Sequence, residues 1–290
     1  MKIHLVDGTY ELFRAHFGAP PKKSASGQEV GATVGLLRSM LLLLSDPEVT
    51  HVAVAFDHVI ESFRNKMYAG YKSSKGVEKV ILDQFPVAEA AVKALGLVTW
   101  PQVKFEADDA IATAVAKFKK SKQVGQIIIC SVDKDLTQMV DGDRVICWDR
   151  RREILLNERG VIEKFGVPPE SIPDFLALVG DSADGYPGIQ GWGERSTSTV
   201  LAKYKHIEAI PDDPNKLGLG LGRATTLLEN LKTNYKDALL FRELSTLRTD
   251  VPLKENLADL KWQGAYPRLK KFCHGLGSQS ILERITRWRK

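Results

Sequence analysis

The sequence predicts an α/β fold in which a mainly parallel, twisted sheet is flanked by helices and followed by a helical region. Three short apolar runs, at residues 3–6, 52–56 and 127–132, each lead directly into an aspartate. Runs that are apolar at consecutive positions are typical of strands buried on both faces, as in a parallel sheet. Helical patterns between these runs, among them 32–44, 85–95 and 108–120, complete the alternation of a doubly wound sheet.

The composition is that of a soluble globular protein. The 290 residues are 43% hydrophobic and 27% charged, which is enough to bury a full core. A net charge of +5 is only mildly basic, so charge alone does not indicate a nucleic-acid partner. The apolar run at 36–44 is too short to span a membrane, and we expect no membrane association.

Three cysteines without a CxxC pair indicate reduced, buried thiols. No signal-peptide pattern precedes the first apolar run. We therefore expect a cytoplasmic or nucleoid-associated protein, with an organelle as the alternative location.

The strand pattern fades at about residue 160, where helical segments punctuated by Gly and Pro take over. This change predicts an α/β core over 1–159 and a helical region over 160–290. We find no internal repeat and no low-complexity tract.

Acidic residues gather at points where the predicted elements begin or end. Asp7, Asp57 and Asp133 end strands, and ligands of parallel sheets bind beyond the carboxyl ends of the strands. Each acid taken singly is more typical of a cap, a turn or the surface, but three acids at one helix start exceed what capping requires. The complete set is Asp7, Asp57, Glu106, Asp108, Asp109, Asp133, Asp135, Asp181 and Asp184.

Carboxylates crowded at one edge raise one another's pKa values and destabilise a fold unless a cation holds them. Oxygen ligands suit hard divalent cations such as Mg²⁺ or Mn²⁺. Two such ions about 3.5–4 Å apart can clamp a phosphodiester during hydrolysis. The six histidines lack the spacing of a Ser/His/Asp triad. The pattern therefore favours metal-dependent hydrolysis.

In order and spacing, the motifs resemble the 5′-nuclease (flap endonuclease) superfamily, especially the 5′-3′ exonuclease domain of bacterial DNA polymerase I and stand-alone 5′-3′ exonucleases. The resemblance covers about residues 1–255. It implies a PIN-like core and structure-selective hydrolysis of DNA at 5′ flaps or single-stranded 5′ ends, which leaves 5′-phosphate products. The matching motifs are Leu5-Val6-Asp7-Gly8, Phe56-Asp57, Phe63-Arg64, Tyr71-Lys72, Glu106-Ala107-Asp108-Asp109, Asp133-Lys134-Asp135, Gly180-Asp181-Ser182-x-Asp184 and Pro187-Gly188-x-x-Gly191-x-Gly193.

The resemblance implies two metal ions, Mg²⁺ or Mn²⁺, in a protein that we expect to be a monomer. It assigns the first ion to Asp7, Asp57, Glu106, Asp108 and Asp109. It implies that Asp133, Asp135, Asp181 and Asp184 hold or tune the second ion.

The resemblance also implies a helical arch near 63–85 through which a single-stranded 5′ end passes. Arg64 and Lys72 resemble catalytic residues at its base, where Lys72 neutralises the scissile phosphate. Tyr71 is expected to stack on a terminal base. Further DNA contacts are expected from Arg14 and Lys75.

Residues 187–202 resemble a helix-hairpin-helix module that grips duplex DNA without reading its sequence. Gly188, Gly191 and Gly193 let the backbone approach a phosphate, and Arg195 adds a positive charge. The resemblance also implies a K⁺ ion in this hairpin. An ordinary turn between two helices is the alternative interpretation.

The sequence departs from the family pattern at two positions near this module. Gly185 stands where an Asn is common, and Trp192 stands where a smaller apolar residue is usual. Two other functions stay open: a DNA-junction binding protein with weak activity, and an RNA-processing metal-dependent nuclease. The presence of all nine acids favours an enzyme, and the hairpin module favours duplex DNA.

Overall fold

The computed structural model describes residues 1–289, and the chain divides into two compact units. Unit 1 combines Met1–Ile60, Ser74–Val132 and Thr249–Lys290, whereas unit 2 combines Glu61–Ser73 and Asp133–Arg248. The sequence pattern, with its boundary near residue 160, did not predict that the C-terminal segment rejoins the N-terminal unit. Within the described residues, we find no helix with the length and hydropathy needed to cross a bilayer.

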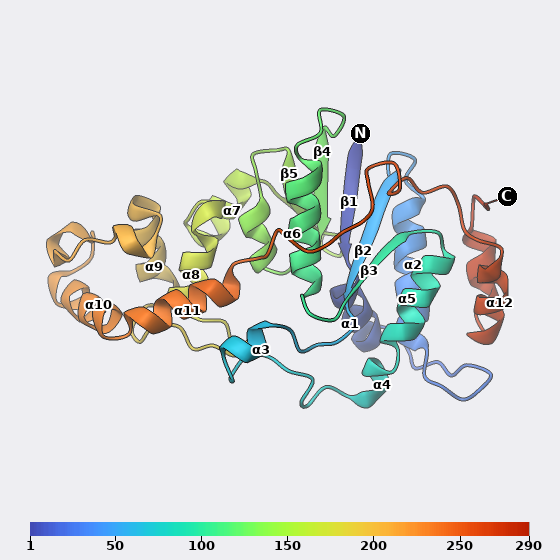
Figure 1. Cartoon of the computed structure of the whole chain (residues 1–290), viewed down its shortest axis with the longest axis horizontal. Helices are drawn as coiled ribbons and strands as arrows, with labels where there is room; N and C mark the ends of the chain where they lie inside the picture. The colour runs from blue at the N-terminus through green and yellow to red at the C-terminus, as the bar shows by residue number, and fades with distance from the viewer. Residues whose placement is uncertain (290) are drawn as a thin grey trace. The chain divides into compact units, whose positions relative to one another are not determined.

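Unit 1 contains four parallel strands in the order β3-β2-β1-β4, which confirms the predicted parallel sheet (Figure 1). The side chains of β1, β2 and β4 are almost wholly buried, because helices cover both faces of the sheet. One strand, β3, was not predicted from the apolar pattern. The strands are β1 (Lys2–Asp7), β2 (His51–Asp57), β3 (Val98–Gln102) and β4 (Gln126–Cys130).

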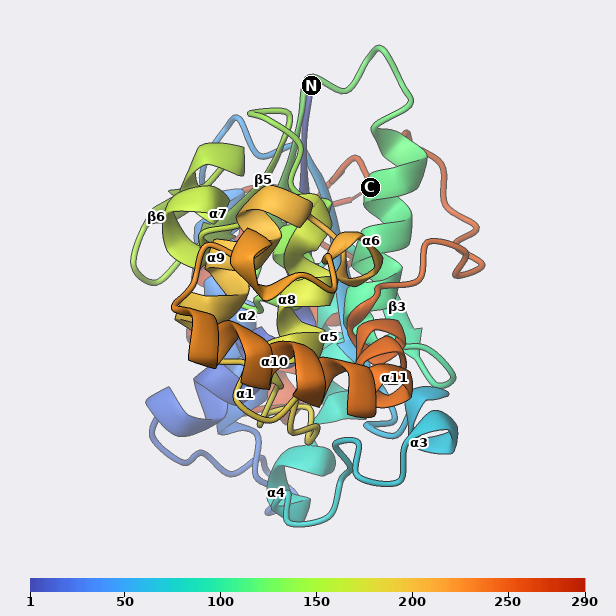
Figure 2. The same ribbon diagram turned by 90° about the vertical axis from the view of Figure 1, so that its left-hand side faces the viewer.

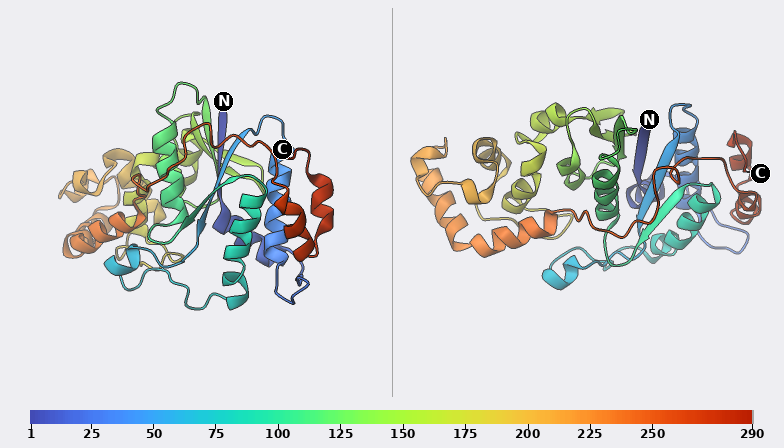
Figure 3. Two further views of the ribbon diagram at one scale, coloured as in Figure 1. Left: turned by 45° about the vertical axis from the view of Figure 1, so that its right-hand side comes forward. Right: turned by 45° about the horizontal axis from the view of Figure 1, so that its top comes forward.

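The chain order of the strands decides which face each helix covers. The steps from β1 to β2 and from β2 to β3 run the same way across the sheet, whereas the step from β3 to β4 runs back. Right-handed crossovers therefore place α6 on the face opposite to α1, α2 and α5, as the left panel of Figure 3 shows. The helices of unit 1 are α1 (Gly8–Gly18), α2 (Gly31–Leu44), α4 (Lys79–Leu82), α5 (Phe85–Ala94), α6 (Ala107–Phe118), α12 (Arg268–Gly275) and the 3₁₀ helix η5 (Gln279–Arg284).

Unit 2 is mainly helical, as predicted for the residues after 160. Helix α8 forms its centre with seven of eight residues buried, and α11 packs against it. Helix α10 ends at the turn from which α11 starts, and both are visible in Figure 2. The elements are α3 (Arg64–Met67), η1 (Asp135–Met139), β5 (Val145–Asp149), β6 (Ile154–Leu156), α7 (Glu158–Phe165), η2 (Pro169–Ser171), α8 (Ile172–Val179), α9 (Glu194–Tyr204), η3 (Ile207–Ala209), η4 (Pro214–Lys216), α10 (Leu221–Thr233) and α11 (Tyr235–Ser245).

The segment expected to form a helical arch, residues 63–85, is mostly non-helical. Only the single-turn helices α3 and α4 form there, and turns occupy much of the chain between them. Gly70, Gly76 and the Ser73–Ser74 pair have low helix propensity, which explains the interruption. The expectation of a helical arch is therefore wrong for this structure.

Candidate active site

In unit 1, two strand ends place carboxylates at the carboxyl edge of the sheet. Asp7 ends β1 and caps α1 by accepting a hydrogen bond from the Tyr10 backbone N–H at 2.8 Å. Its other oxygen accepts a hydrogen bond from Ser131 Oγ at 2.8 Å, just beyond β4. The neighbouring strand β2 ends at Asp57, whose backbone N–H donates to Thr9 Oγ1 at 2.8 Å. The predicted convergence of these two strand ends is therefore present.

The start of α6 joins the same edge. The first backbone N–H of this helix, from Ala107, donates to Asp57 Oδ1 at 2.7 Å. Glu106 is the N-cap of α6, and its backbone N–H donates to Asp109 Oδ2 at 2.9 Å. Asp109 is completely buried and serves as a helix cap, whereas Asp108 is half-buried. Capping therefore accounts for Asp109, and its assignment to a metal stays a prediction.

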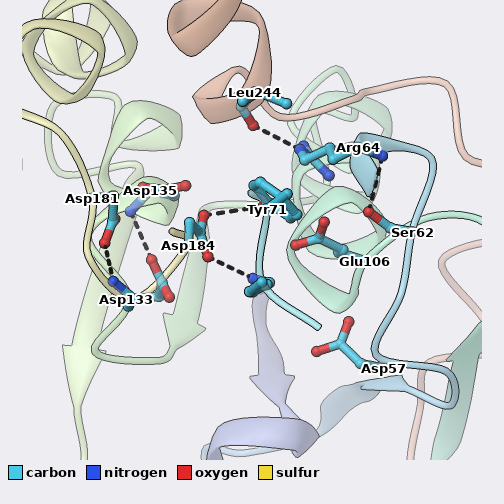
Figure 4. Close-up of polar contacts among 12 residues, drawn as sticks. Asp57, Ser62, Arg64, Tyr71, Glu106, Asp133, Asp135, Asp181, Asp184 and Leu244 are labelled. Atoms are coloured by element: carbon cyan, nitrogen blue, oxygen red, sulfur yellow. Dashed lines mark hydrogen bonds and ion pairs between the residues drawn. The ribbon is translucent and has the colours of Figure 1, made fainter. Parts of the chain in front are cut away.

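The four acids assigned to the second ion all lie in unit 2. Asp133 is exposed and accepts a hydrogen bond from the Asp135 backbone N–H at 2.9 Å. Asp135, Asp181 and Asp184 are at most 7% exposed. Asp181 accepts a hydrogen bond from the Ala183 backbone N–H at 2.9 Å, which fixes the turn before Asp184. Figure 4 shows these carboxylates grouped together.

Asp135 is the carboxylate of this group that is buried with an unsatisfied oxygen. Its Oδ1 atom is buried and has no hydrogen-bond partner. Burial, followed by the nearby charges of Asp133, Asp184 and Asp181, holds the pKa of Asp135 well above its usual range. A carboxylate in such a place is destabilising unless a proton or a cation neutralises it.

Two lysines partly balance the acids of unit 2. Lys72 Nζ lies 2.9 Å from Asp184 Oδ1, and Lys134 Nζ lies 2.8 Å from Asp181 Oδ2. Although burial lowers the pKa of Lys134, the hydrogen bond and the negative charge of Asp181 raise it overall. Both ammonium groups are therefore held beside carboxylates. Of the two, only Lys72 was predicted to take part in the site.

Tyr71 and Arg64 do not have the surface positions expected of DNA contacts. Tyr71 is 4% exposed, and its hydroxyl donates to Asp184 Oδ2 at 3.0 Å (Figure 4). Arg64 is 1% exposed and donates to the carbonyls of Leu244 at 2.6 Å and Thr246 at 3.2 Å. The expected base stacking by Tyr71 and the expected catalytic role of Arg64 do not match these buried positions. In this conformation both side chains hold the Lys72 segment in place.

The hairpin between α8 and α9 is built by close backbone contacts. Gly188 has a φ of 72°, and a Cβ added there would lie 2.4 Å from the backbone nitrogen of Gly180. Gly185 has a φ of 86°, and its added Cβ would lie 2.2 Å from the carbonyl oxygen of Gly70. Only glycine fits these places. The departure from the family's Asn at residue 185 thus has a local structural reason.

The rest of the hairpin is divided between exposed and buried positions. Gly191, Gly193 and Arg195 are exposed, as a DNA-binding surface requires. Trp192 is 3% exposed, and its Nε1–H donates to the Leu227 carbonyl at 3.0 Å. The unusual tryptophan therefore anchors α10 to the hairpin.

The two other expected DNA contacts have different surroundings. Arg14 is half-buried, forms an ion pair with Glu11 and donates to Ser39 Oγ at 3.0 Å. Lys75 is exposed. A contact between either side chain and DNA stays a prediction.

The donor chemistry of unit 2 fits a divalent cation, although the side chains are not arranged as a finished metal site. Among residues 1–289, no group of three or more Asp, Glu, His or Cys side chains is placed to hold an ion. The four acids nevertheless offer only oxygen ligands, and the unpartnered Asp135 Oδ1 is open to a proton or a cation. The acids of unit 1 also offer only oxygen, but several of these atoms already accept hydrogen bonds.

Comparisons with known proteins agree with this arrangement. Residues 2–166 match the family "5′-3′ exonuclease, N-terminal resolvase-like domain", and residues 167–268 match "5′-3′ exonuclease, C-terminal SAM fold". A 5′-3′ exonuclease of Aquifex aeolicus is 32% identical over 98% of this chain and 95% of its own length. The chain belongs to the 5′-3′ exonuclease family.

Other relatives of this 5′-3′ exonuclease family chain are longer or more distant. A DNA polymerase I of Rhizobium leguminosarum is 34% identical over 88% of the chain, which spans 25% of that protein. The zinc-bound T5 5′-exonuclease superposes with a TM-score of 0.67 at 17% identity, covering 98% of this chain and 96% of the neighbour. The catalytic core of Rad2 with DNA substrate gives 0.62 at 14% identity, covering 98% and 91%. These structural likenesses establish the nuclease fold.

Sequence reasoning missed two residues that support the site of this family member. Lys134 stands between two predicted ligands, so its position was a usable signal. Gln138 carries no such signal. Its side chain donates to the carbonyls of Asp135 at 2.8 Å and Ser245 at 2.9 Å, which secures the short helix η1.

Proposed function

We propose that this protein is a divalent-metal-dependent 5′-nuclease that hydrolyses DNA at 5′ flaps or single-stranded 5′ ends. The observation that carries the proposal is the acidic group of unit 2. There, a buried and unpartnered Asp135 oxygen lies among three other carboxylates. Such a group costs stability, and a site that binds hard cations explains its presence. The names of the relatives supply the reaction class.

The acids of each unit would hold one ion, Mg²⁺ or Mn²⁺. Bound ions of this kind lower the pKa of water and stabilise the charge of a leaving oxygen. The first ion is assigned to Asp7, Asp57, Glu106, Asp108 and Asp109. Of these, Asp109 also caps the start of α6. The second ion is assigned to Asp133, Asp135, Asp181 and Asp184.

Lys72 would act on the DNA phosphate. Its ammonium group is held by Asp184 at 2.9 Å, while its side chain stays 29% exposed. Buried Arg64 and Tyr71 fix the stretch of chain that leads to this lysine. A positive charge that is already positioned stabilises a developing negative charge without reorganisation.

The exposed hairpin glycines and Arg195 would grip the duplex backbone of the substrate. A K⁺ ion in this hairpin, a monomeric state and an intracellular location also belong to the proposal. The Rad2 and T5 neighbours were solved with DNA substrate and with metal ions, which supports it.

The test is cleavage of a 5′-labelled flap oligonucleotide by the full chain, with Mg²⁺ or Mn²⁺ and with enzyme in excess. We expect Asp133→Asn to abolish cleavage while junction binding in EDTA stays close to that of the unmodified protein. The matched control is Asp212→Asn, an exposed position of the same unit. Retained cleavage in Asp133→Asn would show that the metal assignment is wrong.

Two further arms separate the alternatives. Tight binding of the flap without cleavage by the unmodified protein would identify a junction-binding protein. Faster cleavage of an all-RNA flap than of its DNA counterpart would identify an RNA-processing enzyme.

A further inference from the structure

A hollow in unit 1 is lined by none of the residues assigned above to metal or DNA. It has a volume of about 670 Å³ and is lined by α5, α12 and the turn before α2. Pockets of roughly 300–1,000 Å³ are the size at which proteins bind small ligands or a few side chains of a partner. Helices α5 and α12, which line it, pack against each other in unit 1 (Figure 1).

The floor of the hollow is apolar. Val30, Ala94 and Leu276 are buried beneath it, and Val87 and Phe272 contribute half-buried side chains. Surfaces of this kind gain free energy when apolar side chains cover them. They offer few hydrogen-bond partners for a phosphate or a metal ion.

The rim of the hollow is positive. Lys93, Arg268 and Lys271 are exposed and line it, and none of its lining residues is acidic. In the part of the chain that the structure describes, none of these three cations forms a salt bridge with a carboxylate. Uncompensated charges around an apolar floor select a partner of opposite charge.

Hydrogen bonds join the segments that line the hollow, without a bound ligand. Arg268 Nη2 donates to the Lys93 carbonyl at 3.4 Å, which joins α12 to the end of α5. The backbone N–H of Ala25 donates to the Gly275 carbonyl at 3.3 Å, which joins the turn before α2 to the end of α12. A preformed pocket loses little conformational entropy when it is filled.

From these observations we infer that the hollow is a docking site for an acidic peptide segment of another protein. The segment inserts one or two apolar side chains over the floor, and its carboxylates face the rim formed by Lys93, Arg268 and Lys271. A single-stranded nucleic acid matches the rim, but the floor offers its bases one aromatic ring, Phe272, among aliphatic side chains. This inference does not depend on the nuclease activity.

The test is fluorescence polarisation with the full chain and a short labelled peptide in which Asp and Glu surround one Leu and one Phe. Two matched probes replace either the acids by Lys or the apolar pair by Ser. We expect the acidic peptide with Leu and Phe to bind, and neither of the two matched probes. The double variant Lys93→Glu/Lys271→Glu should weaken its binding about tenfold or more, because two attractive pairs become repulsive.

Two variants complete the design. Ala90→Trp, at an exposed lining position of α5, should fill the hollow and remove binding without changing the charge. Lys122→Glu, an exposed lysine of the same unit, should bind the probe like the unmodified protein. Thermal unfolding of each variant shows that it remains folded.

Three results would overturn the inference. The first is binding that Ala90→Trp leaves unchanged, and the second is no binding of the acidic probe. The third is displacement of the acidic probe by a single-stranded oligonucleotide, provided that Ala90→Trp also removes binding of the oligonucleotide. That result would make the hollow a nucleic-acid site.

Discussion

Asp135→Asn is expected to stabilise the protein without divalent ions and to remove the stabilisation that such ions provide. The Oδ1 atom of Asp135 is buried without a partner, and the surrounding carboxylates repel its charge. Asn carries no charge at this position, and each unit by which the folded protein raises a carboxyl pKa costs about 1.4 kcal/mol of stability at a pH where the unfolded carboxyl is ionised. In EDTA at neutral pH, we expect the variant to gain about that much free energy of unfolding for each unit.

Divalent ions should reverse the order of stabilities. A ligand that binds only the folded state at about one hundred times its Kd contributes about 2.7 kcal/mol. The unmodified protein should gain roughly this amount in Mn²⁺, whereas Asp135→Asn should gain much less. Urea unfolding in EDTA and in Mn²⁺ measures both effects, and Asp212→Asn is the exposed control in the same unit.

The pH dependence gives an independent check with a defined sign. Because the pKa of Asp135 is raised in the folded protein, its contribution to stability is present at low pH and is lost as the pH rises through the folded pKa. Without divalent ions, the advantage of Asp135→Asn should therefore appear above the ordinary Asp value of 3.8 and grow with pH. A variant that is less stable in EDTA at neutral pH, or that keeps the full Mn²⁺ effect, would refute the reasoning.

Three further predictions concern the segment that carries Lys72. Lys72→Ala should slow single-turnover flap cleavage about 10²–10³-fold and change binding only a few-fold, because the charge acts mainly in the transition state; an unchanged rate would remove Lys72 from the catalytic residues. Arg64→Met should cost about 1–3 kcal/mol in urea unfolding, since the buried Leu244 carbonyl and the partly buried Thr246 carbonyl lose their donor. A variant as stable as the parent would contradict the buried position. Gly185→Ala should lower the free energy of unfolding by about 1–3 kcal/mol, because the added Cβ meets the Gly70 carbonyl and residue 185 has a positive φ. A variant as stable as the parent would contradict this close approach.

Much of the fold could be predicted because its signals are local. The runs that end in Asp7 and Asp57 are β1 and β2, and the predicted helices at 32–44 and 85–95 match α2 and α5 to within one residue. Helix α6 was also anticipated from the acids that open it. These elements repeat a pattern over a short stretch of chain, which periodicity can detect.

What escaped prediction depends on contacts between distant residues. The partners of Arg64 are carbonyls 180 and 182 positions away, so nothing near the arginine indicates that it is buried. The return of the C-terminal segment to unit 1 likewise rests on contacts between distant residues, such as the hydrogen bond from the Val251 backbone N–H to Thr113 Oγ1 at 3.1 Å. A lone Arg or an irregular segment carries no periodicity from which burial can be inferred.

The charges of unit 2 explain why a cation suits this site. Four carboxylates, those of Asp133, Asp135, Asp181 and Asp184, belong to this group, and the ammonium groups of Lys72 and Lys134 pair with those of Asp184 and Asp181. Burial and an excess of nearby negative charge raise the pKa of Asp135, and a divalent ion would offset that charge. Without an ion, the raised pKa of Asp135 lets a proton take up part of this excess. The fold therefore tolerates this group of carboxylates without an ion, at a cost in stability. A bound ion relieves that cost, and the relief adds to the affinity of the group for the ion.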